Sequence, residues 1–126
     1  MERAIKYKAL VEGFDGFVYS DGFLKHKDGT IIIITKQRDN DLETSPIIKG
    51  TLCEFTGLKD KEGVDIYESD VVSDGFEKGV VIYNTETAEY LVDFTLSDYE
   101  PQEIHQSTMW AEVIGNLHTN PELLEQ

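Results

Sequence analysis

The chain has 126 residues, of which 40% are hydrophobic and 29% charged, and its formal net charge is −14 at pH 7. This length and composition predict one globular domain over 1–126, or two packed β subdomains of about 1–48 and 49–126, with a core that needs no disulfide or metal. The single cysteine excludes an internal disulfide, and neither an apolar leader nor a run of roughly 20 apolar residues is visible, so we expect a cytoplasmic protein without a membrane span.

The acidic charge lies almost wholly in the second half of the chain. Residues 1–63 hold 10 Lys and Arg against 11 Asp and Glu, whereas residues 64–126 hold 14 acids and one base, Lys78. Because like charges repel, we expect no direct binding of nucleic acid to this half. A basic protein partner is compatible with the charge, and so is a purely solubilising role.

Short strands are expected along the first half. Residues 5–11 alternate with a period of two, which is typical of a half-buried strand. The Asp28–Gly29 pair predicts a hairpin turn into a buried strand at 31–34. Residues 36–46 contain one apolar side chain, Leu42, and are expected to form an exposed loop, the segment best suited to divide the chain.

The second half continues with turns and short apolar segments. The expected strands cover residues 51–55, 64–67, 70–72, 79–83, 90–94 and 111–117. Asn120 followed by Pro121 is a helix start, and it predicts one short C-terminal helix. No long stretch has the 3.6-residue spacing of an amphipathic helix, so the predicted fold class is mainly β.

Residue patterns for metal or nucleophilic chemistry are not visible. The histidines His26, His105 and His118 are scattered, whereas zinc requires closely spaced ligands, and the 60–65 turn lacks the glycine and glutamate positions of a calcium loop. Cys53 is expected to be a small buried hydrophobe. We therefore expect no metal, no cofactor and no catalytic residue, with a small hydrolase as the remaining enzymatic alternative.

Besides the acidic half, two groups of side chains are candidates for a functional role. Glu68 and Asp70 are two residues apart, which favours a solvated strand edge over an acid–base pair. Phe94, Tyr99 and Trp110 are either a contact patch or, as is commoner in a small β protein, core. The candidate binding face is acidic and consists of Glu86, Glu89, Asp93, Asp98, Glu100 and Glu103.

Four segments in a fixed order carry a family resemblance. They are IKYKA at 5–9, FTGLKDKEG at 55–63, IYESDVV at 66–72 and EVIGNLHTNPELL at 112–124. Together they resemble the YopX family of phage and prophage proteins, which has no established activity. The resemblance implies a barrel-like β fold with an SH3-like second half. The family usually has glycine where Ser69 stands; a positive φ there would cost serine about 1 kcal/mol, so a different turn is expected.

Three functions follow as hypotheses. The first is a non-enzymatic phage or prophage accessory protein in the bacterial host cytoplasm that binds a basic host or phage protein. The second is a nucleic-acid mimic that occupies the basic groove of a DNA-binding protein, which requires the six candidate acids to share one face. The third is a structural homo-oligomer that assembles through exposed strand edges.

Overall fold

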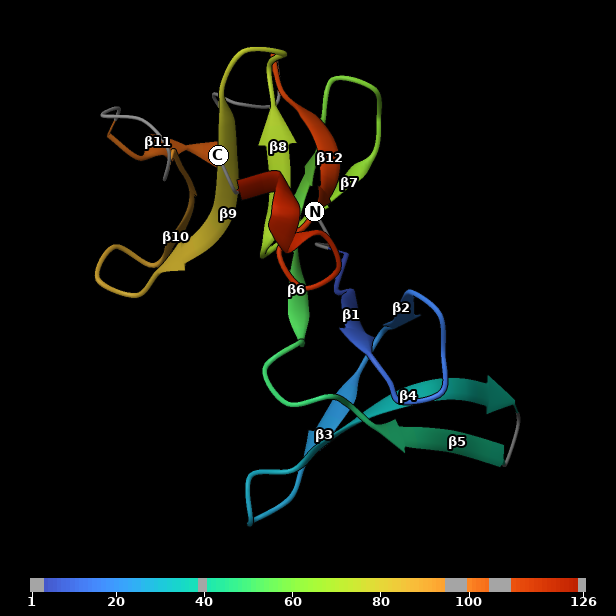
Figure 1. Ribbon diagram of the computed structural model, residues 1–126. Coiled ribbons are helices and arrows are strands. Elements are labelled where there is room, and N and C mark those ends of the chain that lie inside the picture. The colour runs from blue at the N-terminus through green and yellow to red at the C-terminus, as the bar shows by residue number, and fades with distance from the viewer. Residues whose placement is uncertain (1–3, 39–40, 95–99, 105–109, 125–126) are drawn as a thin grey trace. The chain divides into compact units, whose positions relative to one another are not determined.

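The computed structural model describes residues 4–38, 41–94, 100–104 and 110–124, and β-strands predominate in it (Figure 1). The fold is mainly β, as predicted. The chain divides into two compact units, Met1–Phe55 and Thr56–Gln126. The division lies within strand β6 (Cys53–Lys59), which therefore contributes residues to both units. Within the described part of the chain, no helix is long and apolar enough to cross a membrane.

The first unit contains two small antiparallel sheets. In one, β1 lies between β2 and the start of β6; in the other, β4 lies between β3 and β5. The strands are β1 (Tyr7–Leu10), β2 (Phe17–Ser20), β3 (Phe23–Lys25), β4 (Ile31–Arg38) and β5 (Asp41–Pro46). The predicted turn at Asp28 is confirmed, because its Oδ1 accepts the Thr30 N–H at 2.9 Å between β3 and β4.

Alternation along β1 builds the core of the first unit. Ala9 and Val11 are buried together with Ile33 of β4, as the period of two predicts. Lys8, on the opposite face of β1, is buried as well. Its Nζ lies 4.5 Å from the centre of the Phe17 ring, so a cation–π contact accompanies the burial.

The loop predicted at 36–46 is wrong. Residues 36–38 belong to β4 and residues 41–46 form β5, and the two strands pair in the register Lys36↔Glu43 with a bulge between Ile34 and Lys36. The prediction rested on the scarcity of apolar side chains. A hairpin ladder satisfies backbone N–H and C=O groups whatever the side chains are, so a polar strand is compatible with it.

The second unit is built on a five-stranded antiparallel sheet of order β11-β10-β9-β8-β12, while β7 pairs with β6. The elements are β7 (Asp65–Tyr67), β8 (Asp70–Ser73), β9 (Lys78–Asn84), β10 (Glu89–Asp93), β11 (Gln102–Glu103), β12 (Glu112–Asn116) and the 3-10 helix η1 (Pro121–Leu124). The predicted short C-terminal helix is therefore confirmed as a single 3-10 segment.

The core of the second unit lies on one face of this sheet. Its members are Ile66, Val72, Val81, Val92, Phe94, Ile104 and Ala111. The strands β11 and β12 are the two edges of the sheet and do not pair with each other in the described residues. The sheet is consequently not a closed barrel, and the barrel-like and SH3-like details implied by the family resemblance are not confirmed.

Candidate functional site

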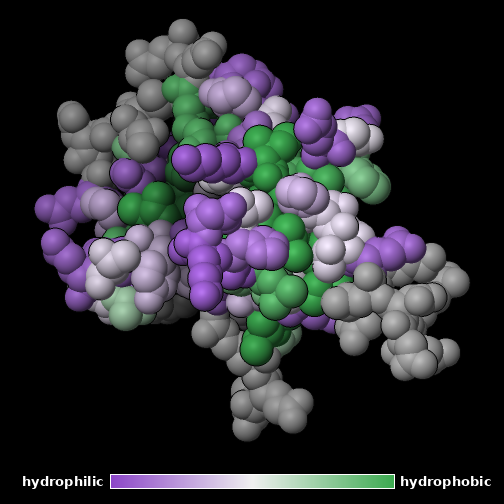
Figure 2. Space-filling view, turned by 90° about the horizontal axis from the view of Figure 1, so that it is seen from below, coloured by the Kyte–Doolittle hydropathy of each residue, from purple (hydrophilic) through white to green (hydrophobic). Residues whose placement is uncertain are grey.

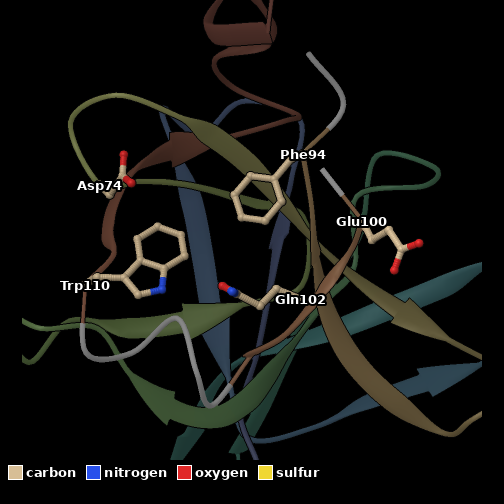
Figure 3. A pocket seen from close by; sticks show the side chains of 5 residues that line it. All are labelled: Asp74, Phe94, Glu100, Gln102 and Trp110. Atoms are coloured by element: carbon tan, nitrogen blue, oxygen red, sulfur yellow. The ribbon is translucent and has the colours of Figure 1, made fainter. Parts of the chain in front are cut away.

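A pocket of about 390 Å³ opens in the second unit. Its described lining residues, which we call the aromatic pocket, are Asp74, Phe94, Glu100, Gln102 and Trp110. Figure 3 shows the two rings beside each other, the Gln102 amide below them, Asp74 next to Trp110 and Glu100 directed away from the rings. An aromatic wall with a few polar groups is the usual composition of a binding site.

The two aromatic rings are fixed by the core. The centroids of Phe94 and Trp110 are 6.1 Å apart and the ring planes differ by 23°. Phe94 is buried within the core cluster, as predicted for an aromatic residue of a small β protein, and Trp110 is half-buried against that cluster. Trp110 therefore belongs both to the packing and to the pocket. Tyr99 lies outside the described residues.

Asp74 organises the β8–β9 turn, which comprises residues 74–77. Its Oδ1 accepts the N–H groups of Phe76 and Glu77, both at 2.8 Å, and the Gly75 N–H donates to Ser73 Oγ at 2.9 Å. The donations from Glu77, and next from Phe76, lower the pKa of Asp74 below its ordinary value. The carboxylate is therefore ionised at neutral pH while it holds the turn.

The ring of Phe76 projects from this turn into solvent. Hydrophobic side chains reach the surface among hydrophilic ones elsewhere too, as Figure 2 shows for the face in view. Phe76 is 94% exposed, more than any other described large hydrophobic residue, and the next most exposed, Ile5, is 62% exposed. An apolar ring held in water on an ordered turn contributes little to folding and is of the residue type that anchors interfaces.

Half of the predicted acidic face shares one side of the sheet. Glu89 and Asp93 lie on β10, and Glu103 of β11 is directly opposite Leu91. Residues that alternate along a strand or oppose each other across a pair share a face, so Glu89, Asp93 and Glu103 lie together. Asp98 lies outside the described residues.

The remaining two described candidate acids lie outside β10 and β11. Glu86 is exposed in the connection between β9 and β10, where its N–H donates to Asn84 Oδ1 at 2.9 Å. Glu100 lines the aromatic pocket. The structure thus places three candidate acids on one face, one at a turn and one at the pocket.

The solvated strand edge predicted for Glu68 and Asp70 is wrong. Asp70 is 1% exposed; its Oδ2 accepts the Tyr67 N–H at 2.8 Å and its Oδ1 accepts Asn116 Nδ2–H at 2.9 Å. The reason is topological, because β8 lies between β9 and β12 inside the sheet. Glu68 is half-buried in the turn that connects β7 with β8.

Ser69 adopts a positive φ of +72°, a conformation that glycine adopts more readily than serine. The prediction that the chain turns differently at this position is therefore wrong. The Ser69 N–H donates to the Val81 carbonyl at 2.7 Å, and the Ser69 carbonyl accepts the Leu117 N–H at 2.9 Å. These two backbone bonds, one to β9 and one beyond β12, hold the residue in a conformation that serine adopts with strain.

We expect Ser69→Gly to raise the free energy of unfolding by about 0.5–1 kcal/mol, because glycine removes the strain but also loosens the unfolded chain. Urea denaturation followed by circular dichroism measures the change. Thr87→Gly is the matched control, since Thr87 is exposed and is not among the positive-φ residues. The control should lose stability, and a loss in Ser69→Gly as well would contradict the strain.

Asp60 is a structural carboxylate at the centre of the FTGLKDKEG segment. Its Oδ1 accepts the N–H groups of Glu62 and Val64, and its Oδ2 accepts the N–H of Val113 of β12, each at 2.9 Å. Burial acts to raise the pKa of Asp60, but the three donations outweigh it and lower the pKa below its ordinary value. The side chain therefore joins the β6–β7 turn to β12.

The other candidates for chemistry are the Cys53 thiol and the side-chain types that bind metal ions. Cys53 is fully buried and donates to the Thr51 carbonyl at 3.4 Å, which confirms the predicted role as a small buried hydrophobe. In the ranges that the structure describes, no three His, Cys, Asp or Glu side chains are grouped so as to hold a metal ion.

These features define a small, mainly β protein of two units, with an aromatic pocket and an exposed phenylalanine turn on the second. The family model described as YopX protein matches residues 6–125, and the chain belongs to the YopX family. The resemblance seen in the four sequence segments is thereby confirmed. No curated protein matches the chain.

Sequence reasoning found only part of the pocket. Phe94 and Trp110 were visible as aromatic candidates and Glu100 as an acidic one. Asp74 stands beside Gly75 in a dipeptide typical of turns, which does not indicate a pocket, and Gln102 carries no signal. The Asp-Gly dipeptide followed by phenylalanine was the one available sign that a turn presents an apolar side chain.

Proposed function

We propose that this protein is a non-enzymatic phage or prophage accessory protein that binds another protein through the aromatic pocket and the β8–β9 turn. The observation that carries the proposal is Phe76, which is 94% exposed on a turn whose backbone is fixed by Asp74. Asp74 also lines the pocket, so the turn that carries the exposed ring borders the recessed site. An exposed aromatic side chain on a turn that borders a pocket is a combination suited to a protein interface.

The charge of the second half of the chain favours a basic partner. Residues 64–126 contain 14 acids and a single base, Lys78. The Nζ of Lys78 donates to the Leu123 carbonyl at 3.0 Å, so this cation is engaged within the unit. An interface with a positively charged surface would be steered by this field and would associate faster at low salt.

The titratable groups of the pocket support binding rather than acid–base catalysis. Among the described lining residues they are Asp74 and Glu100, and both are exposed. A general acid or base works best with a pKa near the operating pH. The pKa of Asp74 is instead lowered by the turn N–H groups of Glu77 and Phe76, which holds it as a permanent anion at neutral pH.

We expect Phe76→Ser to weaken partner binding at least about tenfold while leaving the unfolding midpoint nearly unchanged, because the ring contacts little in the folded protein. The partner is first identified by cross-linking in a bacterial host that carries a related prophage. The dissociation constants of wild type and variant are then measured by isothermal titration calorimetry.

Phe14→Ser provides the matched control, since Phe14 is 61% exposed and belongs to the first unit. It should bind the partner like the wild type. Equal affinities of Phe76→Ser and wild type, or the absence of any specific partner, would contradict the proposed function.

A nucleic-acid mimic is the second candidate, and the shared face of Glu89, Asp93 and Glu103 supports it. This face is smaller than the six-acid face that the sequence predicts, because Glu86 lies in the β9–β10 connection and Glu100 at the pocket. A mimic would displace DNA from a basic DNA-binding protein of the host or phage. The test is a mobility-shift competition in which Glu89→Gln combined with Glu103→Gln should abolish displacement while Phe76→Ser should not. Displacement that depends on Phe76 alone would contradict mimicry and support the first proposal.

A further inference from the structure

We propose that the aromatic pocket receives the guanidinium group of an arginine side chain from the partner, an inference that rests on the proposed binding function. The pocket volume of about 390 Å³ accommodates a long side chain. Its lining combines aromatic rings with carboxylate and amide oxygens, and the guanidinium is the side-chain group that matches both.

The aromatic wall suits a planar cation. Tryptophan is the strongest side-chain partner in cation–π contacts, and arginine also stacks its plane on an aromatic ring. Trp110 is half-buried, so part of its indole is accessible, and Phe94 stacks against it with centroids 6.1 Å apart. Because Phe94 belongs to the core, the indole is positioned before a ligand arrives.

The acceptors lie around this wall. Asp74 uses Oδ1 for the two turn N–H groups, and no described residue hydrogen-bonds its Oδ2. In Figure 3 Asp74 lies above the indole at the rim of the pocket, and the Gln102 amide lies below the rings. Asp74 and Gln102 thus offer oxygens from two segments to a donor that carries five N–H groups in a fixed fork, while the Glu100 carboxylate lines the pocket but is directed away from the rings.

The cations whose side chains the structure describes leave this negative charge largely available. Neither Asp74 nor Glu100 forms an ion pair with a described residue. Lys61 lowers the pKa of Asp74 less than the two turn N–H groups do. A second copy of the chain is a poor occupant, because two molecules of net charge −14 repel each other.

The protein contains one tryptophan, so its fluorescence and its single indole N–H resonance both report on the pocket. The full chain is titrated with the blocked peptide Gly-Arg-Gly and with its lysine and citrulline counterparts. Citrulline keeps the shape of arginine without the charge. We expect a saturable response to arginine, with citrulline at least about tenfold weaker and lysine about threefold weaker.

Asp74→Asn is the test variant, because the asparagine oxygen still accepts the Phe76 and Glu77 N–H groups while the charge is lost. It should bind the arginine peptide at least about tenfold more weakly, with an unchanged circular dichroism spectrum. Glu86→Gln removes one exposed charge from the same unit and should bind the peptide like the wild type.

The outcomes separate this inference from the proposed function. A flat arginine titration, together with a partner that still requires Phe76, overturns the guanidinium assignment and leaves the interface standing. A citrulline response equal to that of arginine overturns it as well, and so does preferred binding of lysine. Arginine binding that Asp74→Asn weakens supports the assignment even where the partner's affinity proves independent of Phe76.

Discussion

Asp60→Ala is expected to lower the free energy of unfolding of the second unit by about 3–5 kcal/mol. The Asp60 carboxylate accepts three backbone N–H groups, from Glu62, Val64 and Val113, each at 2.9 Å. Hydrogen bonds to a charged acceptor contribute about 1.5–3 kcal/mol each, and the donors here lie near a side chain that is 6% exposed. The loss therefore exceeds that of an ordinary surface substitution.

Urea unfolding followed by Trp110 fluorescence measures this effect, because the only tryptophan lies in the second unit. The pH dependence has a defined sign. Since the folded pKa of Asp60 is lowered, its stabilisation is complete above the unfolded carboxyl pKa of about 3.9 and is lost as the pH falls through the folded pKa. The difference between wild type and variant should be full at pH 7 and shrink below about pH 4.

Glu62→Ala is the control for this prediction. Glu62 is exposed in the same turn, and only its backbone N–H reaches Asp60. Its replacement should change the free energy of unfolding by at most about 0.5 kcal/mol. Equal losses in the two variants would show that the turn itself, rather than the carboxylate, carries the stability.

Asn116→Asp is expected to cost about 3 kcal/mol or more at pH 7 while changing the side-chain volume very little. Asn116 is 2% exposed, and its amide nitrogen lies 2.9 Å from Asp70 Oδ1. The substitution replaces this donor with a second carboxyl group, and two carboxylates at such a distance cannot both be ionised without a large penalty.

The pH dependence of this variant has the opposite sign to that of Asp60. The introduced carboxyl group has a pKa raised in the folded state, so the variant regains stability as the pH falls toward the unfolded value of about 3.9. Thermal unfolding between pH 4 and 7 measures the recovery. Asn84→Asp, at a turn where Asn84 Oδ1 accepts the Glu86 N–H, should be nearly neutral. A pH-independent loss in Asn116→Asp would contradict the electrostatic account.

Local features of the fold could be predicted because they depend on neighbouring residues. The hairpin at Asp28 follows from one dipeptide, and the buried positions of Ala9 and Val11 follow from alternation. The buried state of Asp70 could not be predicted, because its amide donor is Asn116, 46 residues away in sequence. A single sequence does not show such pairings.

The same limit applies to the candidate site. Its described lining comes from the β8–β9 turn, the region after β10, β11 and the segment before β12. Trp110 and Phe94 are noticeable as aromatic residues, but their proximity to Asp74 depends on the order of strands in the sheet. Hydrophobic pattern and charge pointed to the acidic half, and strand order decided which of its residues share a pocket.

The hydrogen bond between Asp60 and Val113 also has a consequence for synthesis of the chain. Its partners are 53 residues apart, and the neighbouring Lys61 N–H likewise donates to the Ala111 carbonyl. During translation the central turn cannot complete its contacts until β12 has left the ribosome. The second unit is therefore expected to fold in one late step, with its apolar strands exposed to chaperones and proteases until then.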